Sequence, residues 1–301
     1  TEDLLAVRKM ARDFAIKEIA PTADADDKAH RFRRDLVKKM AELGFFGCVI
    51  PEEYGGNGMG FLAMTMITEE IARVHSSMRL PFNMQAMGPA LTLVRWGTEE
   101  QKRKYVPGLV SADLIGAFAI TEPDAGSDVA AMKTTATRDS DSYVLNGTKT
   151  WISNAQVADV ALVYAYTDPS QRVKGMSAFV VETATPGCSS RPIEEKLGTW
   201  AAPTGELIFE DCRVPSDSLV GNEGEGFKIC MSMLDNTRLS CAAGALGVAQ
   251  ACLDAAVAYA NERHQFGQPI GQFQMIQDLI AQMVVDVEAA RLMVYRAAWQ
   301  K

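Results

Sequence analysis

The sequence predicts an α+β protein in which an antiparallel, barrel-like β-domain lies between two helical domains. The hydrophobic residues follow a period of 3.6 in the first part of the chain, a period of 2 in the middle, and a period of 3.6 again to the end. The 301 residues are 48% hydrophobic and 23% charged, which is an ordinary globular composition. This length suffices for about two or three compact units.

Residues 1–113 are predicted to form an N-terminal α-helical domain. Two sets of apolar residues have the spacing of a buried helical stripe: Leu4, Val7, Ala11 and Phe14, and later Met64, Ile67, Ile71 and Val74. Gly44 is expected to end another helix in the left-handed conformation that glycine adopts readily.

Residues 114–221 are predicted to form the β-domain. Short runs rich in β-branched and aromatic residues predict strands over 115–121, 142–145, 148–153, 159–166, 176–182 and 205–210. Asn146-Gly147 lies between two of these runs and predicts a tight hairpin turn. Because no helical stretch of ten residues separates the strands, a parallel doubly wound sheet is disfavoured.

Residues 222–301 are predicted to begin a C-terminal helical-bundle domain, which we expect to be incomplete within these residues. One stripe of a long helix is formed by Ile276, Ile280, Met283, Val287 and Val294.

Composition argues against several classes of protein. Thirty basic residues against 38 acidic ones give a net charge of −8 without a basic run, so nucleic acid is not an expected partner. No membrane span and no signal peptide are expected, since no apolar run of about 18 residues stands out. The six cysteines form no CxxC pair and the three histidines are scattered, so no metal site is expected. The same cysteine pattern predicts an aqueous, reducing intracellular compartment.

Common nucleotide and hydrolase motifs are also missing. The chain has no GxGxxG after a strand, no GxxxxGK[ST] and no GxSxG. A Rossmann NAD site, a P-loop and a serine-hydrolase elbow are therefore excluded, and any site must be built from other residues.

One candidate site segment runs from Phe118 to Asp128. Strand alternation is expected to place Ala117, Ala119 and Thr121 on one face, leaving room for a flat ligand beside the Thr121 hydroxyl. The turn after it offers backbone N–H groups and a hydroxyl that suit a carbonyl or phosphate oxygen. The alternative is an ordinary strand followed by an Asp/Gly turn.

The second candidate segment runs from Asn146 to Asn154. Trp151 and Ser153 are expected to point to one side and Ile152 to the other, so that an aromatic ring and a hydroxyl could address one ligand. The alternative is a tryptophan in the core.

Together these segments resemble the acyl-CoA dehydrogenases, and the likeness runs along the whole chain. It is carried by four motifs: Pro51-Glu-Glu-Tyr-Gly-Gly56, Ile120-Thr-Glu-Pro-Asp-Ala-Gly-Ser-Asp128, Asn146-Gly-Thr-Lys-Thr-Trp-Ile-Ser-Asn154 and Glu262-Arg-His-Gln-Phe-Gly267. The resemblance implies the same helix, β-barrel, helix architecture, with FAD as cofactor.

The resemblance also implies roles for individual residues. The residues expected to bind FAD are Phe118, Ile120, Thr121, Ser127, Trp151 and Ser153, together with Arg263, Phe266 and Gln274 of a neighbouring subunit. The residues expected to bind the acyl-CoA substrate are Arg79, Ser127, Asp235 and Arg238. Contacts from a neighbouring subunit imply a homo-oligomer, which in this family is usually a tetramer.

The chemistry requires a carboxylate that removes the α-proton of the thioester, while hydride from the β-carbon passes to the flavin. The resemblance implies a glutamate later in the last domain, beyond Lys301. The earlier position that some relatives use is Thr237, so no catalytic residue is assigned. Either the sequence is part of a longer enzyme, or the protein binds FAD and acyl-CoA without turnover.

Arg79 lies where glutaryl-CoA dehydrogenases carry an arginine for the distal carboxylate, and an arginine in an apolar pocket implies an anionic ligand. Leu80 and Ala72 depart from that pattern, and the loss of a glutamate at position 72 indicates a non-decarboxylating enzyme. A cyclic or aromatic-ring-bearing acyl-CoA is the alternative substrate, and an exposed Arg79 in a surface pair is the alternative reading. The resemblance further implies an electron-transferring flavoprotein as electron acceptor, and a cytoplasmic protein if bacterial or a mitochondrial matrix protein if eukaryotic.

Overall fold

The computed structural model describes residues 1–301. Contacts between Cα atoms group the chain into two units. The first unit contains residues 1–23, 60–79 and 238–301, and the second contains residues 24–59 and 80–237. The two units are described in turn, and the three domain boundaries expected from the sequence stay a prediction.

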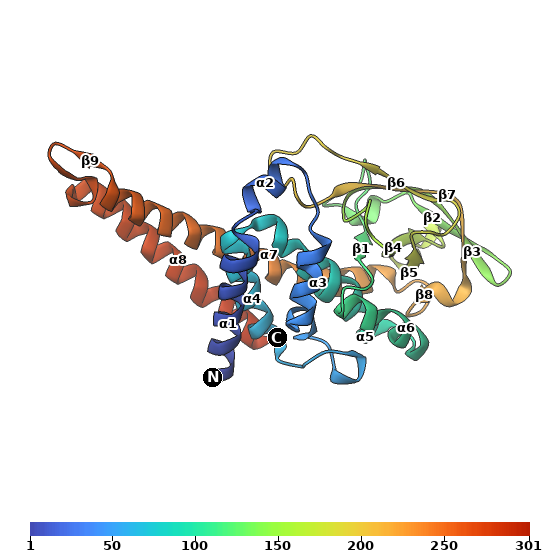
Figure 1. Ribbon diagram of the computed structural model, residues 1–301. Helices are drawn as coiled ribbons and strands as arrows, with labels where there is room; N and C mark the ends of the chain where they lie inside the picture. Colours follow the sequence, from blue (N-terminus) through green and yellow to red (C-terminus); the bar gives the residue numbers. More distant parts are fainter. The chain divides into compact units, whose positions relative to one another are not determined.

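Helices form the first unit. They are α1 (Glu2–Phe14), α4 (Gly60–Val74), the later part of α7 (Gly226–Glu262) and α8 (Gln274–Gln300). Between α7 and α8 the chain makes a small hairpin of β9 (His264–Gln265) and β10 (Gln268–Pro269), at the far tip of the helical pair in Figure 1. The predicted stripe on α8 is confirmed, because Ile280, Met283, Val287 and Val294 pack with Leu246 and Leu253 of α7.

Helices and one sheet form the second unit. Its helices are α2 (Ala23–Lys28), α3 (Arg34–Glu42), a π-helical segment (Phe82–Ala90), α5 (Leu91–Trp96) and α6 (Glu99–Val110). Gly44 follows α3 with φ 74°, so the predicted left-handed stop is confirmed. The buried Gln85 ties the π-helical segment to the sheet, since its side chain donates to Leu109 O and Leu114 O and accepts from the Gly116 N–H at 2.8 Å.

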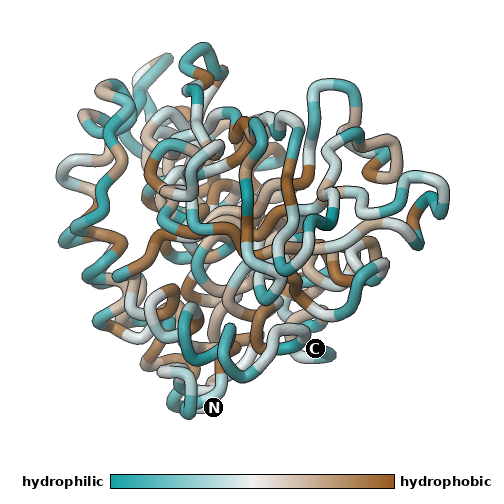
Figure 2. The backbone as a smooth tube through the Cα atoms, turned by 90° about the vertical axis from the view of Figure 1, so that its right-hand side faces the viewer, coloured by the Kyte–Doolittle hydropathy of each residue, from teal (hydrophilic) through white to brown (hydrophobic).

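The sheet has eight strands and is mostly antiparallel, as expected. Its strands are β1 (Gly116–Ala119), β2 (Thr135–Asp139), β3 (Ser142–Ser153), β4 (Val160–Tyr166), β5 (Met176–Glu182), β6 (Cys188–Pro192), β7 (Thr204–Pro215) and β8 (Leu219–Val220). The order is β6-β7-β3-β2-β4-β5-β8, with β1 pairing in parallel to β4. All seven residues of β4 are buried. Figure 2 shows the hydrophobic residues mainly on inner segments and hydrophilic ones on the outer loops.

The predicted hairpin at Asn146-Gly147 is wrong. The chain continues through both residues as one strand, and Gly147 forms part of a β-bulge against β7. The bulge is held by Asn146, which exchanges hydrogen bonds with Asp211. The turn lies earlier instead, at Ser140, which has φ 58°. Asn-Gly suits a bulge as well as a turn, because both require a glycine with unusual φ.

Helix α7 is long and apolar enough to cross a membrane by length and composition alone, a property that core helices of soluble proteins share. Its apolar window is rich in alanine and glycine, which suits close helix packing rather than a lipid-facing surface rich in large residues.

A buried carboxylate holds the helices of the first unit together. Glu69 on α4 has no exposed surface and accepts from Tyr295 Oη at 2.6 Å and from Arg291 Nε at 3.1 Å, both on α8. Arg8 on α1 lies 3.4 Å from the same carboxylate. Burial and this hydrogen bond raise the pKa of Tyr295 above its usual value, so the phenol stays a donor. One side chain thus joins α1, α4 and α8.

Replacing Glu69 with alanine is expected to lower the stability of the protein by roughly 3 kcal/mol, because the half-buried Arg8 and the buried part of Arg291 each lose one of two carboxylate partners and Tyr295 loses its acceptor. Thermal unfolding of Glu69→Ala against wild type measures the loss. Glu42→Ala, at an exposed glutamate without an ion pair, is the control and should melt like wild type. Equal melting of Glu69→Ala and wild type would contradict the role of this carboxylate.

Candidate functional site

A cavity of about 190 Å³ in the second unit is lined by five of the residues that the sequence singled out. They are Phe118, Ile120, Thr121, Trp151 and Ser153, and the remaining walls come from Met84, Gly126, Val129, Ile152 and Leu234. The five residues lie near the ends of β1 and β3, more than 25 residues apart in sequence. The structure therefore places the two candidate segments side by side, as a shared ligand requires.

The expected face of β1 is wrong in part. Ala117 and Ala119 have no exposed surface and pack into the core of the sheet. The alternate residues Phe118 and Ile120 line the cavity instead, together with Thr121 where the strand ends. Because β1 packs on both faces, small residues mark its core side, and the larger side chains form the wall.

The end of β3 is held in an unusual conformation. Trp151 has φ 59° and Asn154 has φ 67°, both in the left-handed region that side chains rarely adopt. The strand also changes register against β7 between Lys149 and Ile152. This turns the Trp151 ring outward, leaving it 59% exposed at the cavity. Strain of this kind persists where the surrounding structure enforces it, and it clusters at binding sites.

Asn154 enforces this conformation. Its side chain is buried and donates to Gly116 O at 3.0 Å, while its backbone N–H donates to Pro203 O at 2.8 Å. The sequence alone gave Asn154 no role, although it ends the motif that contains Trp151 and Ser153. Its position directly after Ser153 was the one indication that it supports the site.

Two hydroxyl groups at the cavity have no partner in the protein. Neither Thr121 Oγ1 nor Ser153 Oγ makes a hydrogen bond within the chain, and both residues are only half-buried. They stand beside the apolar walls formed by Phe118 and Ile120 and by the exposed ring of Trp151. A flat heteroaromatic ring with polar atoms along its edge fits such a set of groups. The residues present thus fit a flavin ring.

A buried ion pair braces this cavity from the protein side. Lys149 is fully buried, and its ammonium donates to Glu122 at 2.8 Å and to Ile120 O at 3.1 Å. Burial alone would raise the pKa of Glu122, but the Lys149 charge and hydrogen bonds from Thr134 and Lys133 outweigh it and lower the pKa. The pair therefore fixes the end of β1, where Ile120 and Thr121 face the cavity.

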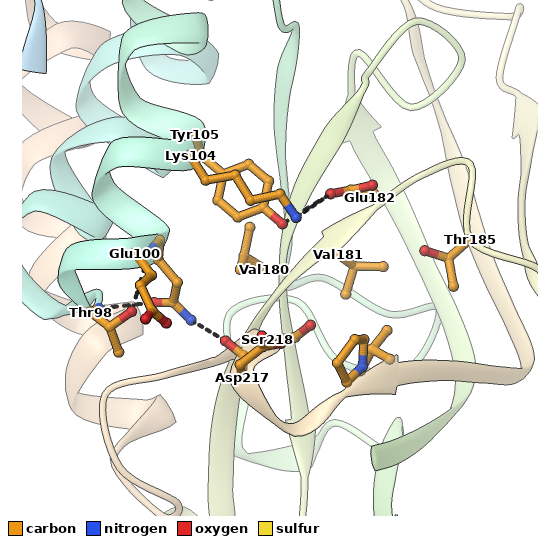
Figure 3. Close-up of a pocket in the computed structure, with 13 residues that line it drawn as sticks. Thr98, Glu100, Lys104, Tyr105, Val180, Val181, Glu182, Thr185, Asp217 and Ser218 are labelled. Atoms are coloured by element: carbon orange, nitrogen blue, oxygen red, sulfur yellow. Dashed lines mark hydrogen bonds and ion pairs between the residues drawn. The ribbon is translucent and has the colours of Figure 1, made fainter. Parts of the chain in front are cut away.

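A second cavity of about 350 Å³ lies between α6 and the strands β5 and β7 (Figure 3). Two of its charged groups pair with each other: Lys104 lies 2.8 Å from Glu182, and the Tyr105 hydroxyl donates to the same carboxylate at 3.1 Å. Gln101 donates to Asp217 O. None of the residues predicted from the sequence lines it, and no unpaired donor set points to a ligand.

The other predicted residues are distributed as follows. Ser127 lies exposed in the turn between Gly126 and Val129, both of which line the first cavity. Asp235 is exposed on α7 directly after Leu234, another lining residue. Arg238 is also exposed on α7, in the first unit.

Arg79 follows α4 in the first unit and is half-buried. Its guanidinium has one contact, with Cys241 Sγ of α7 at 3.7 Å, and no acidic partner. An exposed surface ion pair, the alternative reading, is therefore not present. The side chain is left as an uncompensated cation.

Arg263, Phe266 and Gln274 lie in and beside the hairpin between α7 and α8, also in the first unit. All three are exposed, and Phe266 keeps 92% of its surface despite a left-handed φ of 53°. Arg263 and Gln274 make no side-chain hydrogen bond or ion pair within the chain. This tip thus presents an aromatic ring and two polar groups outward.

Comparison with known proteins identifies the class. The N-terminal, middle and C-terminal domain models of acyl-CoA dehydrogenase match residues 1–113, 117–212 and 224–301. The chain therefore belongs to the acyl-CoA dehydrogenase family, an FAD-dependent family of oxidoreductases.

Among particular relatives, glutaryl-CoA dehydrogenase of Desulfococcus multivorans is 53% identical over the whole chain and 78% of its own length. A solved glutaryl-coenzyme A dehydrogenase complex with glutaryl-CoA superposes with a TM-score of 0.97, covering 99% of this chain and 76% of that one. Butyryl-CoA dehydrogenase of Megasphaera elsdenii is 38% identical with a TM-score of 0.97, covering 100% and 79%. The protein is thus an FAD-dependent acyl-CoA dehydrogenase.

Replacing Glu122 with glutamine is expected to destabilise the protein and weaken FAD retention, because the buried Lys149 loses its counter-charge. A carboxyl whose pKa falls on folding adds stability above its unfolded pKa of about 4.3, and that stability is lost as the pH falls through the folded pKa. The difference in free energy of unfolding between wild type and Glu122→Gln should therefore be largest near neutral pH. It should shrink as the pH falls through the folded pKa of Glu122.

Denaturant unfolding across pH measures this gap, and flavin absorbance after gel filtration measures retention. Asp124→Asn is the matched control, since Asp124 lies in the same turn and pairs with Lys133 at an exposed position. It should behave like wild type. A gap that grows with acidification would contradict the role of Glu122.

Proposed function

We propose that this acyl-CoA dehydrogenase oxidises an acyl-CoA with a carboxylate at the far end of its acyl chain, glutaryl-CoA first among them. The observation that carries the proposal is the half-buried Arg79 guanidinium without an acidic partner. Such a group is tolerated chiefly when a ligand supplies the anion, and a guanidinium binds a carboxylate through two parallel hydrogen bonds. The name of the relative at 53% identity points to the same substrate.

The alternative substrate is a cyclic or aromatic-ring-bearing acyl-CoA. Apolar side chains follow Arg79 in sequence, and one of them, Met84, lines the cavity assigned to the flavin ring. These residues would then shape a bulky apolar pocket. Arg79 distinguishes the two candidates, because a ring without a charge gives the guanidinium nothing to bind.

Bound FAD supplies the hydride acceptor for the reaction. The residues of this chain orient its ring, through the walls formed by Phe118, Ile120 and Trp151 and the hydroxyls of Thr121 and Ser153. Thr237 does not serve as the base, because it is buried and its hydroxyl donates to Leu234 O at 3.3 Å. The base is proposed to be a carboxylate outside these 301 residues, and without one the protein would bind its ligands but not turn them over.

The proposed enzyme keeps the distal carboxylate of its substrate. Ala72 occupies the position where a glutamate is associated with decarboxylation, and it packs where α4 meets α7. A Cβ on Gly247 of α7 would lie 3.0 Å from Ala72 Cβ, so little space is left for a longer side chain. Position 72 therefore supplies no carboxylate to the substrate.

The proposed electron acceptor is an electron-transferring flavoprotein. A chain in a solved structure of the electron transferring flavoprotein of Acidaminococcus fermentans superposes with a TM-score of 0.97 at 46% identity, covering 99% of this chain and 79% of that one. This similarity supports a flavoprotein as the electron acceptor.

The proposed active form is a homo-oligomer, a tetramer by family resemblance. Helix α8 also carries several large apolar side chains that are exposed in the single chain. The exposed side chains on it include Met275, Leu279, Val285, Leu292, Met293 and Trp299. Apolar surface of this extent on a folded protein marks an interface. In such an oligomer the tip with Arg263, Phe266 and Gln274 is proposed to contact the FAD of a neighbouring subunit, as the family resemblance implies.

Substitution of Arg79 tests the substrate. Arg79→Met is expected to lower kcat/KM for glutaryl-CoA by about tenfold or more, since a charge-assisted hydrogen bond contributes roughly 1.5 to 3 kcal/mol. The Arg79→Lys variant keeps the positive charge but loses the planar guanidinium that forms two parallel hydrogen bonds with a carboxylate. It should also turn over glutaryl-CoA markedly more slowly. Butyryl-CoA should be affected little or used better. Equal losses on both thioesters in steady-state kinetics would make Arg79 structural and favour the cyclic or simple acyl-CoA.

Substitution of the hairpin residues tests the cross-subunit contact. Arg263→Ala and Gln274→Ala are expected to weaken FAD retention by about tenfold or more and to loosen the oligomer, because each removes a polar group that faces a neighbouring subunit. Flavin content and light scattering measure the two effects. Arg95→Ala, at an exposed arginine elsewhere, is the control. Unchanged retention and assembly would show that these side chains do not reach a neighbour.

A further inference from the structure

The side chain of Arg79 lies directly against a glycine of α7. A Cβ built on Gly244 would stand 2.5 Å from Arg79 Cδ and 2.7 Å from Arg79 Nε. Cβ atoms essentially never come this close to another heavy atom. The Cδ and Nε atoms of Arg79 therefore occupy the space that the side chain of any other residue at position 244 would fill.

A second glycine three residues further along α7 serves a different purpose. A Cβ on Gly247 would stand 2.9 Å from the backbone nitrogen of Arg73 and would also collide with the Glu69 carbonyl. These atoms belong to the backbone of α4 and cannot move without separating the two helices. Gly247 is required for helix packing, whereas the groups that meet Gly244 belong to a flexible side chain.

We infer that Gly244 is a positioning residue for substrate selectivity, because its missing side chain leaves the space in which the Arg79 side chain lies against α7 and can bind a distal carboxylate. The inference rests on the proposed function. Arg79 has one contact besides this surface, with Cys241 Sγ one turn earlier on the same helix. With no carboxylate of the protein to hold it, the direction of the side chain is set by the surface of α7.

An alanine at position 244 acts on Arg79 and not on the fold. The methyl group displaces the flexible stem, while α7 itself gains a better helix former. Displacement of a charged group by even a small distance disrupts paired hydrogen bonds to a carboxylate, because their geometry is fixed by the planar fork. Recognition of the carboxylated substrate falls, and substrates without the carboxylate are spared.

The test measures selectivity, defined as kcat/KM for glutaryl-CoA divided by kcat/KM for butyryl-CoA, in the FAD-loaded enzyme. Gly244→Ala is expected to lower this ratio by about tenfold, in line with loss of a charge-assisted hydrogen bond. Calorimetric binding of the two thioesters should show the same shift in the ratio of dissociation constants. The melting temperature should stay unchanged or rise.

Two further variants separate this effect from packing. In the Arg79→Met background, Gly244→Ala should change the ratio by no more than about twofold, because it acts through the missing guanidinium. Gly247→Ala is the matched control on the same helix and should lower the melting temperature while leaving the ratio unchanged. A wild-type ratio in Gly244→Ala, an equal loss in the Arg79→Met background, or a melting temperature as low as that of Gly247→Ala would each overturn the inference.

The same data distinguish failure of the inference from failure of the proposed function. If Arg79→Met leaves the ratio unchanged, the carboxylate role of Arg79 fails and the inference fails with it. If Arg79→Met collapses the ratio and Gly244→Ala does not, the proposed function stands and only the inference on Gly244 is overturned.

Discussion

The cavity assigned to the flavin depends on one buried ion pair. Lys149 and Glu122 come from the two segments that form the cavity, and each would be costly to bury alone. Paired, they leave no free charge, since the ammonium also donates to Ile120 O and the carboxylate accepts from Thr134 and Lys133. The ion pair and these hydrogen bonds therefore fix the residues that follow β1. A strand only four residues long can thus present Phe118, Ile120 and Thr121 in fixed positions.

Different forces shape the two sides of this cavity. The end of β1 is fixed by charge, whereas the end of β3 is fixed by backbone strain that the buried Asn154 enforces. Strain raises the free energy of the folded state, so it persists only where neighbouring hydrogen bonds outweigh it. Here those bonds run from Asn154 to Gly116 O, at the start of β1, and to Pro203 O, just before β7. The two walls are consequently coupled through the same short strand.

Periodicity predicted the helices, the strands and the stripe on α8, because each buries one face of a regular element. It failed where a residue type suits two conformations: Asn146-Gly147 fits a bulge as well as a turn, and small residues such as Ala117 fit a core as well as a ligand site. Strand alternation singled out Thr121, Trp151 and Ser153 among the cavity residues, whereas Phe118 and Ile120 were assigned through resemblance to a family. Lys149, Glu122, Gln85 and Asn154 received no role, because their partners lie far away in the chain and pairing across such distances cannot be derived from spacing alone.

The two glycines of α7 show how one helix surface can serve packing and selectivity at once. Close approach of α4 and α7 requires Gly247, and it also brings Ala72 into the contact, which leaves little room for a longer side chain at position 72. The same approach sets Arg79, five residues after α4 ends, against Gly244 with no counter-charge nearby. An arginine that is paired within the protein would have to break its own ion pair to bind a ligand, in addition to losing its water. Arg79 has no ion pair to break and loses only its water, so its charge stays available to an anionic substrate.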